Sequence, residues 1–188
     1  FNSRGDARNA VDNLRFFAGS SEKVRYIPTL DFDFHRNIMP NPEDCWEKNT
    51  ALFHLLNDSS PAIYVTTVGA AIQKTLTPDH FIEATISIRT DMEIPRETLV
   101  STLIRNGYQM LPNASDPGSF AIRGGIVDIF SPLYPNPLRI EYLGDFVESL
   151  RFFRPHDQRS LETALEAHII PVKQSLIPRG EGCLKVAP

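Results

Sequence analysis

Apolar residues near the start of the chain recur at three- and four-residue intervals, which is the spacing of an amphipathic helix. The positions that form this apolar face are Ala10, Val11, Leu14 and Phe17. Asp6 can cap the start of this helix. Two further helices are predicted over 42–57 and 68–74, and they alternate with strand-like runs over 24–28 and 62–67. Helices and strands in this order are typical of a parallel α/β unit.

The pattern changes after about residue 84, where strand-like alternation begins. A helix is predicted from Pro95 to Asn106, because its apolar residues share one face: Leu99, Leu103 and Ile104. Short turns then separate strand-like runs over 119–122, 126–130, 138–143 and 146–153. One helix packed on an antiparallel meander forms a small α+β domain.

Beyond the meander, a short helix is predicted over 160–166 and a strand over 167–171. The predicted fold class is therefore α/β and α+β. A partial parallel-sheet α/β lobe covers residues 1–84, and a small α+β domain with an antiparallel sheet covers 85–155.

Composition narrows the functional classes. The chain has 188 residues, of which 41% are hydrophobic and 22% are charged, as in an ordinary globular protein. The net charge of −4 argues against a dedicated nucleic-acid binder. No apolar run is long enough to cross a bilayer, and Cys45 and Cys183 have no metal-ligand spacing. We therefore expect a cytoplasmic protein with free thiols and no membrane partner.

The sequence carries no recognisable catalytic or cofactor motif. No glycine is followed by lysine, which argues against a phosphate-binding loop of the Walker type. The histidines are dispersed along the chain, at His35, His54, His80, His156 and His168. Asp31 and Asp33 could pair, but no third ligand lies near them in sequence, so a solvated loop is expected. We expect no catalytic residue, no metal site and no cofactor in this chain.

The hairpin over 138–153 determines which side chains face solvent. Alternation places Leu138, Ile140 and Tyr142 on one face and Arg139, Glu141 and Leu143 on the other. We assign the first set to the core, which leaves the second set on an open face. Such a face can bind a partner protein, or it can carry a solvated Arg139–Glu141 pair of little energetic value beside an ordinary exposed leucine. The pattern by itself favours the solvated pair.

The charges around the meander favour protein over phosphate as a partner. Residues 84–155 contain seven arginines, no lysine and eight acidic residues. A phosphate-binding patch would be basic overall. Arginine without lysine suits a protein interface, because the planar guanidinium pairs with carboxylates and stacks on rings.

The longest specific motif is F-A-I-R-G-G-I-V-D-I-F-S-P from residue 120, followed by P-L-R-I-E-Y-L-G-D-F-V-E-S-L-R-F-F from 137 and D-Q-R-S from 157. These runs resemble the transcription-repair coupling factors and, more distantly, the excision-repair protein UvrB. The likeness extends upstream to Ile27-Pro28, to residues 65–74 and to residues 105–108.

This resemblance implies an organisation and a function. Residues 1–84 would be most of a degenerate, incomplete lobe related to the first helicase lobe of UvrB. Residues 85–155 would be an inserted UvrA-binding domain, and 156–188 the start of a third small domain with a tail. The implied UvrA-binding positions are Arg123, Arg139 and Leu143, where Leu143 stands at the place of a family aromatic residue.

The full-length family members are ATP-dependent DNA translocases that displace stalled RNA polymerase in transcription-coupled nucleotide excision repair. Their motor, with its ATP and magnesium, and their contacts to polymerase and DNA are expected in other domains, so we expect this chain to be no enzyme. The alternatives are a fragment of UvrB that acts in damage recognition, a DNA-binding module and an ATPase fragment. Salt-dependent duplex binding and nucleotide binding would reveal the last two.

Overall fold

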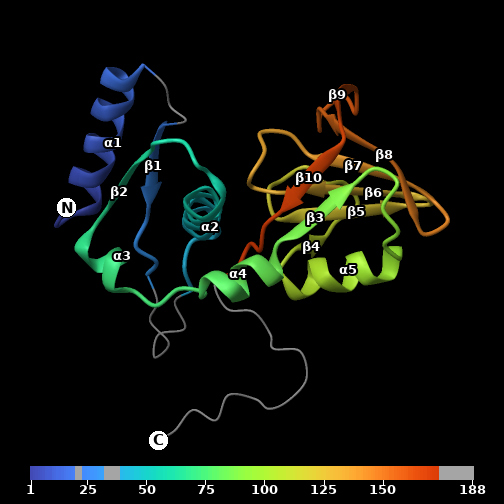
Figure 1. The fold of residues 1–188 in the computed structure, drawn as a ribbon, viewed down its shortest axis with the longest axis horizontal. Helices are drawn as coiled ribbons and strands as arrows, with labels where there is room; N and C mark the ends of the chain where they lie inside the picture. Colours follow the sequence, from blue (N-terminus) through green and yellow to red (C-terminus); the bar gives the residue numbers. More distant parts are fainter. Residues whose placement is uncertain (20–22, 32–38, 174–188) are drawn as a thin grey trace, which may run out of the picture.

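A computed structural model describes residues 1–19, 23–31 and 39–173. The chain forms two parts that lie side by side in Figure 1, and helix α4 (Pro78–Ala84) leads from one to the other. In this described part no helix is long and apolar enough to span a membrane.

The first part is an α/β lobe built on two parallel strands. Strand β1 (Val24–Ile27) pairs with β2 (Ile63–Thr66), so that Val24 faces Ile63 and Ile27 faces Thr66. The helices of this lobe are α1 (Arg4–Ala18), α2 (Pro42–Asn57) and α3 (Val68–Ile72). The predicted helix–strand order is confirmed, while α4 lies outside the predicted elements.

The start of α1 differs from the prediction. Ser3, rather than Asp6, is the N-cap, because the Ser3 hydroxyl accepts a hydrogen bond of 3.1 Å from the Asp6 backbone N–H. Asp6 lies in the first turn, where its negative charge complements the helix dipole. The helix ends at Gly19, whose φ of 63° is left-handed.

The second part is built on a six-stranded sheet with the order β4-β5-β6-β7-β8-β9. Its strands are β4 (Gln109–Met110), β5 (Ser119–Arg123), β6 (Ile126–Phe130), β7 (Leu138–Leu143), β8 (Phe146–Phe153) and β9 (Ser160–Ala164). All neighbours are antiparallel except β4 and β5. Strand β3 (Ile86–Arg89) pairs separately with β10 (Glu166–Ile169).

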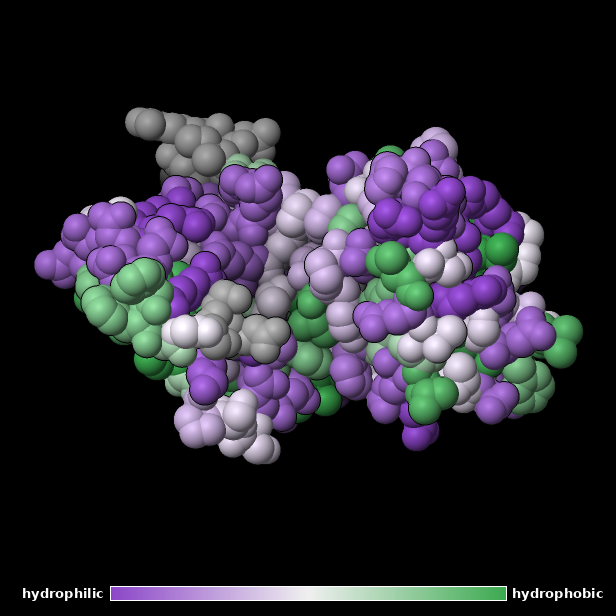
Figure 2. Space-filling view, turned by 90° about the horizontal axis from the view of Figure 1, so that it is seen from above, coloured by the Kyte–Doolittle hydropathy of each residue, from purple (hydrophilic) through white to green (hydrophobic). Residues whose placement is uncertain are grey.

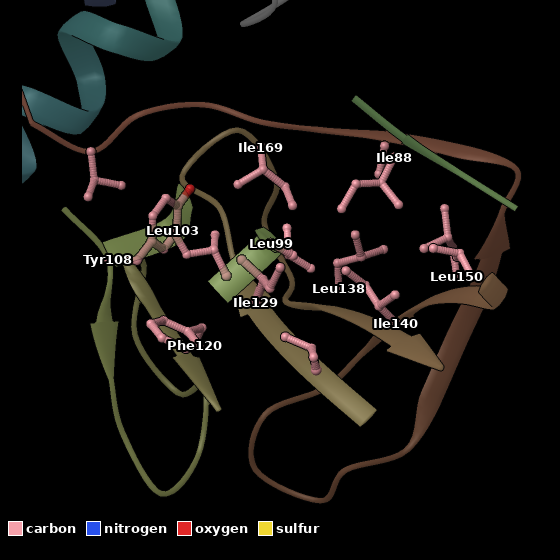
Figure 3. Packing of buried hydrophobic residues seen from close by; sticks show 14 residues of the cluster. Ile88, Leu99, Leu103, Tyr108, Phe120, Ile129, Leu138, Ile140, Leu150 and Ile169 are labelled. Carbon is pink, nitrogen blue, oxygen red and sulfur yellow. The ribbon is translucent and has the colours of Figure 1, made fainter. Parts of the chain in front are cut away.

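The core lies against one face of this sheet, which we call the inner face. Leu99 and Leu103 of α5 (Arg96–Arg105) are fully buried, and they lie among Ile129, Leu138 and Ile169 in Figure 3. Leu138 and Ile140 point inward, as the alternation predicted. Ile104 was expected on the apolar face of α5, and this is wrong, because its side chain is 57% exposed.

The predicted helix over 160–166 is also wrong. Residues 160–164 of this segment form β9, which pairs with β8 through Phe153↔Ser160 and Leu150↔Ala164, and Glu166 begins β10. Its residues tolerate a helix, but an open sheet edge offers backbone hydrogen bonds that override weak propensity. Strand β10 then places Ala167 and Ile169 in the same core as α5. Residue 155, the expected end of the α+β domain, therefore lies between two paired strands.

Hydrogen bonds fix the path of the chain after β10. The Asn49 side-chain amide of α2 donates to the Pro171 carbonyl at 2.7 Å, and the Tyr108 hydroxyl donates to the Ile170 carbonyl at 2.8 Å. Burial raises the pKa of Tyr108. These contacts connect both parts of the molecule to one segment.

Candidate protein-binding surface

The opposite face of the six-stranded sheet, which we call the outer face, carries charged side chains. Cross-strand register aligns Asp128 with Arg139 and Arg139 with Arg151. Arg123 lies at the end of β5 before the Gly124 turn, where φ is 60°. Because side chains alternate, these residues point away from buried Ile140 and Leu150.

One buried carboxylate holds both arginines that the resemblance identifies. Asp128 is 1% exposed, and its Oδ1 and Oδ2 accept hydrogen bonds from Arg139 Nε at 2.7 Å and Nη2 at 2.9 Å. Arg123 Nη2 donates to Asp128 Oδ2 at 2.6 Å. The hydrogen bonds that Arg139 donates to Asp128 raise the pKa of Arg139 despite partial burial. Two guanidinium groups on one carboxylate leave a net positive charge.

Gln158 completes this arrangement, which we call the Asp128 cluster (Asp128, Arg123, Arg139 and Gln158). Its Oε1 accepts from Arg123 Nη2 at 3.0 Å and from Arg139 Nη2 at 2.8 Å. Its Nε2 donates to the Pro155 carbonyl at 2.9 Å, which turns the amide oxygen toward the arginines. Gln158 has a left-handed φ of 60°, so the turn is shaped for this contact at some conformational cost.

The two arginines are not equally accessible. The Arg139 guanidinium stacks over Phe153, with its carbon 4.3 Å from the ring centroid, and its side chain is 16% exposed. The Arg123 side chain is 45% exposed. Arg139 therefore lies on the outer face, as predicted, but its side chain is mostly buried rather than open. Arg123 presents the more accessible charge.

Glu141 has a different partner from the expected one. It accepts a hydrogen bond from Ser149 Oγ at 2.7 Å and forms an ion pair with Arg151. These contacts, the Ser149 bond first, lower the pKa of Glu141. The predicted solvated Arg139–Glu141 pair is therefore wrong, because Arg139 takes the buried Asp128 instead.

Leu143 lies at the tip of the β7–β8 hairpin, away from the Asp128 cluster. Its side chain is 70% exposed. It lies four positions beyond Arg139, which is about 13 Å along a strand. Tyr142 points inward, as predicted, and burial raises its pKa to about 12. The structure thus brings Arg123 and Arg139 together and leaves Leu143 separate.

Asp128, Gln158 and the Leu143 neighbour Phe146 were not among the predicted site residues. A sequence signal existed for Asp128, since it is a charged residue inside the apolar run I-V-D-I-F. Gln158 belongs to the D-Q-R-S motif. Neither signal reveals which arginines the residue contacts.

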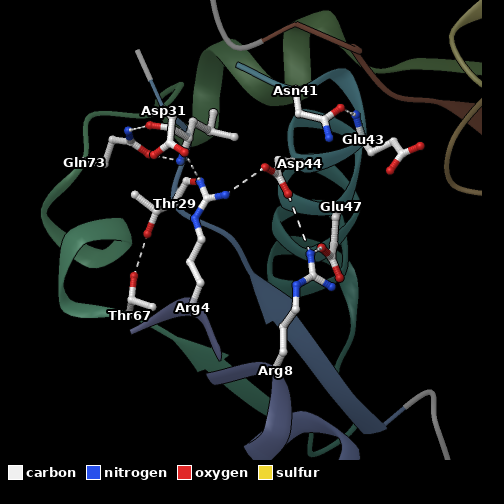
Figure 4. A network of polar contacts seen from close by, with 11 residues as sticks. Arg4, Arg8, Thr29, Asp31, Asn41, Glu43, Asp44, Glu47, Thr67 and Gln73 are labelled. Atoms are coloured by element: carbon white, nitrogen blue, oxygen red, sulfur yellow. Dashed lines mark hydrogen bonds and ion pairs between the residues drawn. The ribbon is translucent and has the colours of Figure 1, made fainter. Parts of the chain in front are cut away.

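Charged residues of the α/β lobe are also paired (Figure 4). Arg4 contacts Asp31 at 3.1 Å and Asp44 at 3.3 Å, and Arg8 contacts Glu47 at 3.1 Å. Asp31 therefore belongs to an ion-pair network, whereas Asp33 lies outside the described residues. Within the described ranges, no group of three or more His, Cys, Asp or Glu residues could hold a metal ion. Burial raises the pKa of the Cys45 thiol, which disfavours a reactive thiolate, while Cys183 lies outside the described residues.

The surface around these sites mixes polar and apolar residues. Figure 2 shows hydrophilic and hydrophobic side chains interspersed over both parts of the molecule on the face that it presents. Among the described residues, exposed apolar side chains of the second part include Ile104, Met110, Leu143, Phe146 and Leu165. A partner surface here has to combine charge with local apolar contacts.

Comparison with known proteins identifies relatives. Residues 86–174 match the family described as the UvrB interaction domain. The chain is 30% identical over 183 residues to the transcription-repair-coupling factor of Myxococcus xanthus, covering 92% of this chain and 15% of that protein. It is 34% identical over 172 residues to the transcription-repair-coupling factor of Bacillus subtilis, covering 91% and 14%. The UvrABC system protein B of Chlorobium phaeobacteroides is 26% identical over 171 residues, with 91% and 25% covered. The chain thus spans a small part of each relative.

Proposed function

Because residues 86–174 belong to the UvrB interaction domain family, in a chain homologous to the transcription-repair-coupling factors, we propose that this module recruits UvrA in transcription-coupled nucleotide excision repair. The observation that carries the proposal is the Asp128 cluster, in which one buried carboxylate positions two arginines on the outer face.

The cluster suits recognition of an acidic protein surface. Asp128 neutralises only one of the two guanidinium charges, and the exposed part of Arg123 can pair with a carboxylate of the partner. Arg139 is held in a fixed position by its hydrogen bonds to Asp128 and by stacking on Phe153. Rigid donors lose little conformational entropy on binding. Leu143, about 13 Å along β7 from Arg139, would add a separate apolar contact on the same face.

The activity of the whole protein is part of the same proposal. The longer protein would use an ATP- and magnesium-dependent DNA translocase in other domains to displace stalled RNA polymerase. This chain would then supply UvrA binding. We assign it no catalytic step and no cofactor of its own.

The alternative of a UvrB fragment has weaker support. Identity is 26% to the UvrB protein of Chlorobium phaeobacteroides, against 30% and 34% to the two coupling factors. A DNA-binding role is disfavoured because the net charge is −4, and residues 84–155 carry seven arginines against eight acidic residues.

Calorimetric titration of UvrA with Arg123→Ala and Arg139→Lys tests the proposal. Arg123→Ala leaves the two-bond Arg139–Asp128 contact intact, and Arg139→Lys keeps the charge without the planar fork. Truncating a well-placed interface arginine typically costs about 2 kcal/mol, or about 30-fold in affinity. Arg89→Ala removes an exposed arginine on β3 and is the control. Wild-type affinity in both cluster variants would refute UvrA recruitment through this face.

A further inference from the structure

An exposed aromatic residue lies directly across the hairpin from Leu143. Phe146 is the cross-strand partner of Leu143, and their side chains are 51% and 70% exposed. Directly opposed residues of an antiparallel pair have Cβ atoms about 5 Å apart, so the two side chains form one apolar element. We call this pair the hairpin tip.

The hairpin tip faces the same side as the arginines. The neighbours of the pair, Tyr142 and Val147, point inward, and Val147 is fully buried. Alternation therefore directs Leu143 and Phe146 outward, and the register shift beside Glu141 leaves Val147 opposite Tyr142. Across the strands, Arg123 is paired with Ile126, and Ile126 is paired with Glu141, so these three side chains share one face. Leu143 follows Glu141 by two residues and therefore lies on the same face. Charge and apolar tip thus lie on one continuous face.

Backbone hydrogen bonds hold the tip in place. The Ile94 N–H donates to the Asp145 carbonyl at 2.9 Å, and the Tyr142 N–H donates to the Gly125 carbonyl at 2.9 Å. Glu93 also forms a β-bridge with Phe146. A single exposed leucine is ordinary on a protein surface. A fixed aliphatic–aromatic pair on the same face as a positively charged cluster instead has the composition of an apolar interface anchor with a polar surround.

We infer that Phe146, together with Leu143, is the apolar anchor of the UvrA-recruiting face and receives an apolar side chain of the partner that lies near the carboxylate bound by Arg123. This inference rests on the proposed function. It adds Phe146 as a residue that determines affinity, and it specifies the partner epitope as an apolar side chain next to an acidic one.

Titration of UvrA with Phe146→Ala, Phe146→Thr and Phe146→Tyr tests the inference. We expect about tenfold weaker binding for the alanine variant, as for truncation of an aromatic anchor, and near wild-type binding for tyrosine, which keeps the ring. Phe146→Thr removes the ring but retains strand propensity, so it covers the case in which alanine disturbs the hairpin. Leu165→Ala, at a residue 80% exposed between β9 and β10, is the matched control and should bind normally.

The salt dependence of binding and a comparison with Arg123→Ala separate the possible outcomes. The loss from Phe146→Ala should be the same at low and high salt, whereas the loss from Arg123→Ala should shrink as salt screens the charge. If Arg123→Ala weakens binding and neither Phe146→Ala nor Phe146→Thr does, recruitment stands and the anchor is overturned. If none of these variants weakens binding, the recruitment proposal itself fails.

Discussion

Replacing Asp128 by asparagine removes the charge that holds the outer face together while keeping the side-chain volume. Asp128 is 1% exposed and accepts hydrogen bonds from Arg123 at 2.6 Å and from Arg139 at 2.7 and 2.9 Å. Asparagine keeps one acceptor and turns an NH₂ group toward a guanidinium donor. The variant therefore leaves two positive charges side by side without a counterion.

The expected loss of stability follows from this burial. Removing one partner of a buried ion pair typically costs about 3–5 kcal/mol. Here Arg123 is 45% exposed and Arg139 is 16% exposed, so water relieves part of the unpaired charge and the lower end applies. We expect a decrease of about 3 kcal/mol in the free energy of unfolding, or a fall in Tm of roughly 6–12 °C for a chain of this length.

Urea unfolding of wild type, Asp128→Asn, Arg139→Met and the double variant measures this. Arg139→Met removes one of the uncompensated charges, so the double variant should lose less than the sum of the two single changes. A decrease below about 1 kcal/mol for Asp128→Asn, with additive changes, would refute the view that this carboxylate organises the face.

Three further predictions concern other parts of the chain. The pKa of Glu141 is lowered in the folded state. Its contribution to the free energy of unfolding is therefore fully present above the unfolded-state pKa of about 4.3 and is lost as pH falls through the folded-state pKa. In urea titrations, the difference in unfolding free energy between wild type and Glu141→Gln should disappear on acidification. Lys48 is 2% exposed, burial lowers its pKa, and its amine donates to Gln73, whose Oε1 also accepts from the Leu30 N–H. Lys48→Met should therefore raise Tm, with a gain of about 1 kcal/mol, and a fall in Tm would contradict this. Gly107 has a φ of 95°, and an added Cβ would lie 2.5 Å from the Lys173 side chain, so Gly107→Ala should cost about 1 kcal/mol or more by urea unfolding; unchanged stability would contradict it.

Much of the second part of the molecule could be predicted from local pattern. The four hairpin strands and the inward set of Leu138 and Ile140 follow from strict alternation, because one face of a sheet must be buried. The turns at Gly124 and Gly144 could be predicted because glycine tolerates a left-handed backbone. Their φ values in the structure are 60° and 65°. These features depend on residues close together in sequence.

The partners of the charged residues could not be predicted in the same way. Arg139 and Glu141 are near neighbours on one strand, yet Arg139 binds Asp128 on β6 and Glu141 binds Arg151 on β8. The segment over 160–166 has residues compatible with a helix, but pairing with β8 makes it a strand. Cross-strand register and an open sheet edge decide these outcomes.

The sequence by itself determined the helix–strand order of the first lobe up to α3, the four strands of the meander, the two faces of the central hairpin and the family motif around the R-G-G turn, because each depends on short-range periodicity and turn chemistry. Only the tertiary structure decided that Asp128 and Gln158 accept hydrogen bonds from both Arg123 and Arg139. It also decided that Phe146 lies opposite Leu143. The physical reason is that sheet register and the segment between β8 and β9 bring together side chains far apart in sequence, such as Arg123 and Gln158, which are 35 residues apart and whose contact no local rule encodes.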